Sequence, residues 1–140
     1  MSHSLPKDFY YALVSFLLQA KQQVISVASE FGLTGVQALT LLTLRHNVQR
    51  SMSDFCKLYD CDASNITGIV DGLEQKNLVS RQPHPNDRRI KIIHLEPAGV
   101  ELQKQLINRI AEVSPHLFAG LTTTETHELA RLIQKTQPIK

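Results

Sequence analysis

The strongest constraint on the fold is the order of elements between residues 51 and 95, where two short helical segments lead directly into two β-rich runs. Ser51 and Asp62 are each suited to cap a helix, because their side chains can accept from the first free backbone amides. The runs LVSRQ at 78–82 and IKIIHL at 90–95 follow, joined by the loop PHPNDRR. This order predicts a helix–turn–helix pair followed by a β-hairpin with a long tip.

Helical patterns flank this region on both sides. Apolar residues recur at spacings of three and four over 9–31 and predict one long helix that Gly32 ends. Thr34 to Gln37 matches a capping box and opens a second helix. Pro97 suits the first turn of another helix, and Thr122 to Glu125 forms a further capping box before a last one. We therefore expect a mainly α fold with a small β-hairpin.

Length and composition bound the protein class. A chain of 140 residues is long enough for one domain with a real core, and its 42% apolar and 20% charged residues are ordinary for a globular protein. No window approaches the roughly 18 apolar residues of a membrane span, and the N-terminus lacks the pattern of a secretory signal. Two cysteines fit a reducing compartment. We expect a cytoplasmic protein with no membrane partner.

The net charge of +2 is unevenly distributed. Residues 76–94 carry five basic side chains against one acidic, a net +4, so the rest of the chain sums to −2. Residues 60–76, by contrast, carry a net −3. A local basic patch on a nearly neutral protein indicates a polyanion that touches one place.

Helix, turn, helix and a two-stranded ribbon form the signature of a winged helix-turn-helix, whose second helix enters the major groove of DNA. The N-terminal part of helix 62–76 exposes Ser64, Asn65 and Thr67, which are small enough to approach base edges or phosphates. Arg88 and Arg89 at the loop tip are suited to neutralise phosphates or to enter a narrow minor groove. These five residues are the candidate DNA contacts.

The stretch DASNITGIVDGLEQKNLVSRQPHPNDRRIKIIHLEPAG, residues 62–99, resembles the MarR family of bacterial regulators. The resemblance rests on Leu73-Glu74, Leu78-Val79, Arg81, Asp87 with Arg89, and Leu95 to Gly99, in that order and spacing. The helix order extends it over residues 1–140 as a single MarR-like domain. It divides the chain into a winged helix-turn-helix lobe at 34–96 and a helical dimerisation lobe at 1–33 and 97–140.

The resemblance implies a homodimer that binds a pseudo-palindromic operator in duplex DNA. It implies a transcription regulator, here expected to be a repressor released by a small-molecule signal. In the family the arginine that matches Arg89 enters the minor groove, and the aspartate that matches Asp87 fixes the loop. Gly68 falls at a DNA-facing position that is often arginine in relatives, and Asn77 replaces a cap glycine. Because helix 62–76 is acidic, we expect DNA binding to depend strongly on the wing.

Three other readings remain open from the sequence. The acidic helix keeps a winged-helix protein-interaction module as the alternative function. An apolar cleft near Tyr11, Phe16 and His46 is a candidate pocket for an aromatic or phenolic effector. The lowest-ranked reading is an oxidant or metal sensor. Cys56 lies on an apolar face, and two aspartates beside Cys61 are expected to raise its thiol pKa.

Catalytic and metal motifs do not emerge from the sequence. The six histidines form no HxxxH or HExxH pair, so we expect no metal site. The chain has no glycine-rich phosphate loop, no GxSxG and no clustered acid pair. An enzyme is not expected, and neither is a cofactor.

Overall fold

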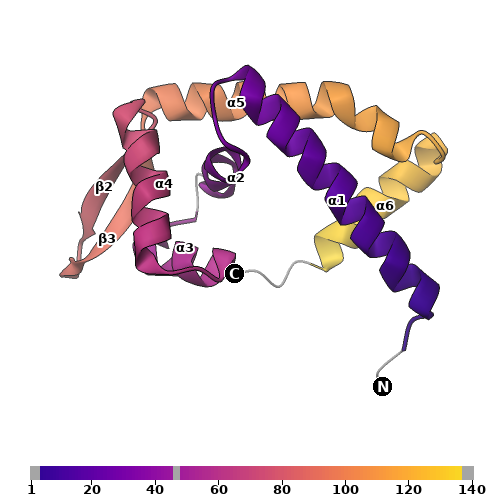
Figure 1. The fold of residues 1–140 in the computed structure, drawn as a ribbon, viewed down its shortest axis with the longest axis horizontal. Coiled ribbons are helices and arrows are strands. Elements are labelled where there is room, and N and C mark those ends of the chain that lie inside the picture. The colour runs from indigo at the N-terminus through magenta and orange to yellow at the C-terminus, as the bar shows by residue number, and fades with distance from the viewer. Residues whose placement is uncertain (1–3, 46–47, 137–140) are drawn as a thin grey trace.

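The computed structural model describes residues 4–45 and 48–136 and has six α-helices, a short 3-10 helix and three strands in those residues (Figure 1). In chain order they are α1 (Lys7–Glu30), α2 (Gly35–Thr43), β1 (Arg50–Ser51), α3 (Met52–Tyr59), α4 (Ala63–Gln75), β2 (Val79–His84), β3 (Asp87–Leu95), α5 (Pro97–Val113), η1 (Ser114–Phe118) and α6 (Thr123–Lys135). The predicted class, mainly α with a small β-hairpin, is confirmed.

Four of the six α-helices in the described residues, α2, α3, α4 and α6, begin at side-chain caps. Thr34 and Ser51 each form a complete capping box, and Asp62 accepts from the Asn65 amide at the start of α4. Thr122 accepts from the Glu125 amide, so only this half of the capping box predicted for α6 is present. Local chemistry thus sets where these helices start.

The sheet differs from the prediction in two ways. Its order is β1-β3-β2, so β3 is central and pairs antiparallel with both neighbours. The two-residue β1 was missed because so short a strand carries no periodic pattern. The prediction of a long loop at the hairpin tip was also wrong. The strand pairing continues through Pro83 opposite Lys91 and His84 opposite Asp87, with a register shift between Pro83 and His84. Edge position and irregular pairing make the proline tolerable there.

The core joins α2, α3, α4 and the sheet to the C-terminal end of α1 and the middle of α5. Its buried members include Leu41, Phe55, Ile66, Val70, Leu73, Ile93 and Leu106, each at most 3% exposed. In Figure 1 these elements form one end of an arch, with α5 along the top and α1 and α6 at the other end. The core therefore holds the helix–turn–helix pair and the wing in one lobe.

The other end of the arch is poorly covered. The buried residues of α1 are Val27 and Ala28, near its C-terminal end, and every residue of α6 is at least partly exposed. The exposed large apolar side chains of α1 are Phe9, Tyr10, Tyr11, Leu13, Val14, Leu17, Leu18 and Ile25. Taken singly, no helix in the described residues is long and apolar enough to span a membrane, and α1 with α2 meets that test only as a pair bent by 97°.

Candidate nucleic-acid interface

The second helix of the pair, α4, has one buried and one open face. Ile66, Val70 and Leu73 are at most 1% exposed and fix the helix against the core. Thr67 and Gly68 lie on the open side, where a Cβ added at Gly68 would meet no atom of the described residues within 4 Å. The open face is therefore accessible along the N-terminal half of α4.

The first turn of α4 is organised by Asp62. Its Oδ1 accepts from the Asn65 amide at 2.9 Å and from the Ser64 hydroxyl at 2.8 Å. The Asn65 amide and then the Ser64 hydroxyl lower the pKa of Asp62, so its carboxylate stays charged. Thr67 donates its hydroxyl to the Ala63 carbonyl at 2.8 Å. Ser64, Asn65 and Thr67 are all exposed. The hydroxyl oxygens of Ser64 and Thr67 and the side-chain amide of Asn65 therefore face solvent.

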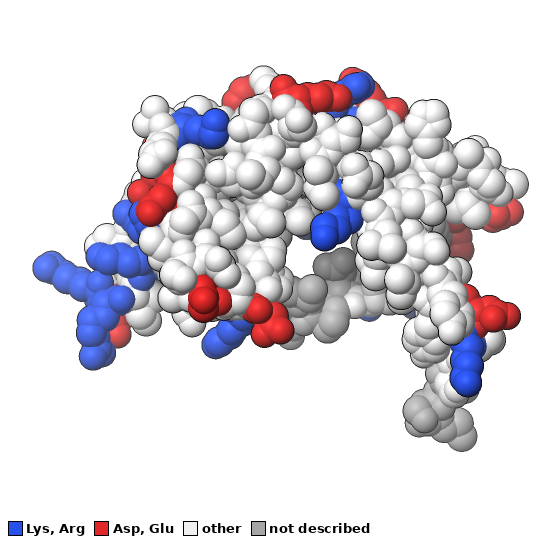
Figure 2. Space-filling view, viewed as in Figure 1, with Lys and Arg blue, Asp and Glu red and all other residues white. Residues whose placement is uncertain are grey.

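The wing tip presents cations. Arg88, Arg89 and Lys91 of β3 are exposed, and the space-filling view shows lysine and arginine gathered at the β2–β3 end of the molecule (Figure 2). Asp87 accepts from the Arg89 backbone amide at 3.0 Å, from its Nε at 3.1 Å and from its Nη2 at 3.2 Å. The Arg89 side chain remains 90% exposed. Arg89 is thus oriented by Asp87 while its outer face stays open.

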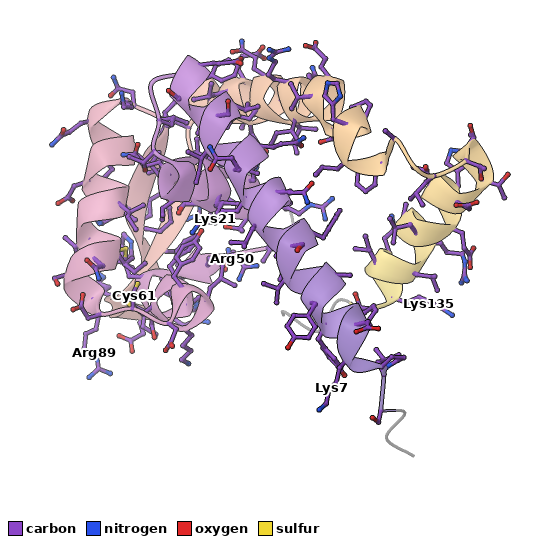
Figure 3. The ribbon with its side chains drawn as sticks, turned by 45° about the vertical axis from the view of Figure 1, so that its right-hand side comes forward. Lys7, Lys21, Arg50, Cys61, Arg89 and Lys135 are labelled. Carbon is purple, nitrogen blue, oxygen red and sulfur yellow. The ribbon has the colours of Figure 1, made fainter. Side chains whose placement is uncertain are left out.

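The bonds from Arg89 also act on Asp87. They hold the pKa of the Asp87 carboxyl below its ordinary value, first through the side chain and then through the backbone amide. The carboxylate is therefore charged near neutral pH. Figure 3 shows Arg89 projecting from the end of the lobe at which Cys61 precedes α4, so the wing tip and the start of α4 lie on the same side.

Arg81 of β2 has a role that the sequence did not reveal. Its guanidinium donates to Asp71 at 2.5 Å and to Glu74 at 2.7 Å, and its backbone amide donates to Glu74 at 2.9 Å. Its Nη2 also donates to the Thr67 carbonyl at 3.3 Å. Arg81, one of the five basic side chains counted in residues 76–94, is thus paired with two acidic residues of α4.

This ion-pair cluster changes the charge of the interface. Two of the acidic residues of the segment 60–76 are paired with Arg81, and the other two, Asp60 and Asp62, lie just before the start of α4. The same bonds tie β2 to α4. The wing and α4 are therefore held at a fixed mutual angle by charged hydrogen bonds as well as by the core.

Comparison with known proteins decides the family. Residues 33–91, from the α1–α2 turn to β3, match the family model described as MarR family. The HTH-type transcriptional repressor NicR of Pseudomonas putida is 31% identical over 103 residues, which cover 74% of this chain and 65% of that protein. The chain belongs to the MarR family. The HTH-type transcriptional repressor MdtR of Bacillus subtilis is a further relative, 25% identical over 132 residues, which cover 94% of this chain and 84% of that protein.

Solved MarR structures share the fold. Wild-type MarR (apo form) from E. coli superposes with a TM-score of 0.79 at 22% identity, covering 98% of this chain and all of that one. A mutant MarR from E. coli complexed with operator DNA superposes with a TM-score of 0.72 at 22% identity, covering 94% and 95%. The MarR-like resemblance and the winged-helix fold are confirmed.

Two of the predicted effector residues of this MarR-family chain, Tyr11 and Phe16, have different surroundings in the structure. Tyr11 is 76% exposed and lines a shallow hollow with Tyr10, whereas the Phe16 ring packs on Phe118 at 5.9 Å between centroids. His46 lies outside the described residues. Another hollow, of about 710 Å³, lies between α2 and α5 and is lined by Leu42, Arg45, Gln103, Lys104, Ile107 and Asn108.

The two cysteines of this MarR-family chain lie close together around the end of α3. The Cys61 amide donates to the Cys56 carbonyl at 3.1 Å, and both side chains are half-buried. Burial raises the pKa of Cys61 most, followed by the fields of Cys56, Asp62 and Asp60. The predicted direction is confirmed, with burial as the main cause. Within 4–45 and 48–136, no group of three or more His, Cys, Asp and Glu could hold a metal ion.

Proposed function

We propose that this MarR-family protein is a sequence-specific, duplex-DNA-binding transcription regulator of the cytoplasm, and that it acts as a repressor. One observation carries the proposal: the open N-terminal half of α4 and the cationic wing tip lie on the same side of one rigid lobe. A helix of this size fits the major groove, and a β-ribbon beside it reaches the flanking backbone or minor groove.

The residues divide into two roles. Ser64, Asn65 and Thr67 of α4 contact base edges or phosphates, and Gly68 lets the helix approach the DNA closely because nothing projects from it. At the wing, Arg89 enters the minor groove with Arg88 on the adjacent phosphates. Asp87 supports the wing by orienting Arg89 before DNA arrives, which lowers the entropy lost on binding.

The same proposal includes a homodimer. Tyr11 and Leu18 of α1 are 76% and 62% exposed, and Leu132 and Ile133 of α6 are 44% and 43% exposed. Exposed apolar side chains on two helices at the same end of the arch are typical of an interface. A second copy would cover it in an isologous dimer, and the two winged lobes would then face the two halves of a pseudo-palindromic operator.

A small aromatic or phenolic effector would release the repressor. The hollow of about 710 Å³ between α2 and α5 supports this part of the proposal, because Arg45 and Lys104 supply cations and Leu42 and Ile107 supply apolar surface. Tyr11 and Phe16 do not line this hollow: Tyr11 lines another one on α1, and the Phe16 ring packs on Phe118. No step of this function requires catalysis.

Selection of bound sequences from a pool of random duplex DNA tests the proposal. The expected result is an enriched inverted repeat that the purified protein binds at least about a thousandfold more tightly than unselected DNA at physiological salt. A pool with no enriched sequence would contradict the regulator proposal and favour the protein-interaction module. Thermal-shift screening with aromatic acids and phenols tests the effector, and no stabilising compound would count against it.

A further inference from the structure

The C-terminal end of α2 is held by side chains from two distant parts of the chain. Gln103 of α5 donates its Nε2 to the Leu41 carbonyl at 2.6 Å and to the Leu44 carbonyl at 3.0 Å. Arg50 of β1 donates its Nε to the Thr43 carbonyl at 3.3 Å. The Leu41 and Thr43 carbonyls also accept from nearby backbone amides, those of Leu44 at 3.2 Å and Arg45 at 3.1 Å, so the side-chain bonds add to the local ones at this helix end.

The sequence places no glycine at the end of α2. Helices commonly end in a left-handed glycine, but α2 is followed by Leu44 at φ −84° and then by Arg45. Leu41 and Leu44 have buried side chains, at most 3% exposed, so the position of this helix end is coupled to the core as well. In addition to its local backbone bonds, the end of α2 is held by bonds across 59 and 62 residues of sequence.

The two donors belong to different parts of the arch. Gln103 lies on α5, which runs along the top of the arch in Figure 1 towards α1 and α6. Arg50 lies on β1, where it pairs with Ile93 of β3, the central strand of the wing. The end of α2 is thus a joint between α5 and the wing sheet.

We infer that Gln103 is a positioning residue that fixes the winged lobe against α5 and so sets the distance between the two wings of a dimer. The inference rests on the proposed function, because that distance matters for an operator with two half-sites. If the joint is rigid, the protein accepts one half-site spacing and rejects others. If the joint is loosened, each lobe still binds its half-site but the spacing is discriminated less.

The side-chain amide of Gln103 supplies the two N–H groups that these bonds use. Methionine and alanine have no such donor. The adjacent hollow of about 710 Å³ lets water reach the freed carbonyls, so the variants are expected to fold. Gln105 is a matched control on the same helix, because it is exposed and donates only to Glu101, at 3.4 Å.

The test compares the parent with Gln103→Ala, Gln103→Met and Gln105→Ala on DNA selected by the parent. Each protein is titrated against one half-site, the full site, and full sites with one or two base pairs added at the centre. For the Gln103 variants we expect half-site affinity within about twofold of the parent. The spacing penalty, which is the loss of affinity when base pairs are added at the centre, should be at least about fivefold smaller than in the parent. Gln105→Ala is expected to keep the parental penalty.

A parental spacing penalty in both Gln103 variants would overturn the inference. If the parent selects no DNA, the regulator proposal fails on its own terms, and amide hydrogen exchange then decides on the joint. Gln103→Met should speed exchange in the last turn of α2 and in β1, relative to the parent and to Gln105→Ala. Unchanged exchange in both segments would also overturn the inference.

Discussion

Replacing Arg81 by methionine should loosen the wing from α4 by a measurable amount. The change removes charged hydrogen bonds to Asp71 and Glu74 at 2.5 and 2.7 Å and a longer one to the Thr67 carbonyl at 3.3 Å. The side chains of Arg81, Asp71 and Glu74 are 23%, 49% and 32% exposed, so solvent screens them in part. A hydrogen bond to a charged group contributes about 1.5–3 kcal/mol to folding stability when it is shielded from solvent. An exposed ion pair contributes below about 1 kcal/mol. We expect a total loss of about 1–3 kcal/mol.

Thermal unfolding at fixed protein concentration measures this loss. At about 2–4 °C per kcal/mol for a chain of this size, Tm should fall by roughly 2–12 °C in Arg81→Met. Lys76→Met is the matched control, because Lys76 is an exposed basic residue at the C-terminal end of α4. This change should alter the free energy of unfolding by less than about 0.5 kcal/mol. Equal melting temperatures for Arg81→Met and Lys76→Met would refute the assignment of this cluster as a stabilising contact.

DNA binding separates the mechanical effect of Arg81 from its electrostatic effect. Without Arg81, the carboxylates of Asp71 and Glu74 are left uncompensated on α4 and repel the phosphates. The triple variant Arg81→Met, Asp71→Asn, Glu74→Gln removes that repulsion. Its affinity for the selected operator should recover relative to Arg81→Met. No recovery would indicate that the fixed angle between wing and helix, rather than charge, is what Arg81 contributes.

Three further outcomes are expected. A Cβ at Gly99 would lie 2.0 Å from the Leu78 carbonyl, so Gly99→Ala should lower the free energy of unfolding in urea by about 1–3 kcal/mol or more; parental stability would contradict this close contact. The Asn65 amide lowers the pKa of Asp62. The charged Asp62 carboxylate therefore stabilises the folded protein fully above roughly pH 4, and this contribution is lost as the pH falls through the lowered pKa. Asp62→Asn keeps the cap acceptor but loses the charge, so it should be less stable than the parent in urea at pH 7, and by a smaller margin at pH 3. An equal margin at both pH values would argue against a contribution from the Asp62 charge. Leu18→Glu should convert the proposed dimer to a monomer in sedimentation experiments, whereas an unchanged mass would exclude α1 from its interface.

Local chemistry made much of the fold predictable. Thr34, Ser51 and Asp62 cap their helices within three residues of sequence, so a short pattern is sufficient to place each start. The apolar period located α1, and the alternating run before Pro97 located β3. Asn77 adopts a left-handed conformation at φ 58°, which is why asparagine can replace glycine at the end of α4.

Features that depend on contacts across the chain were not predictable. The pairing of Arg81 with Asp71 and Glu74 requires β2 to fold back on α4, and charge counting along the sequence placed these residues in opposite patches. β1 exists because β3 offers a free edge, and its two residues carry no signal of their own. Gln103 gave no sign of its bonds to α2, because glutamine on a helix is usually a solvent-exposed residue.

The dependence of DNA affinity on Arg89 tests the central claim most directly. Arg89→Ala and the control Arg131→Ala, an exposed arginine on α6, are titrated against the selected operator at several salt concentrations. We predict that Arg89→Ala binds at least about tenfold more weakly, with a salt slope smaller by about one, while dimerisation, Tm and Arg131→Ala binding stay at parental values. Equal affinity and equal salt slope for Arg89→Ala and the parent would contradict the claim that this wing binds DNA.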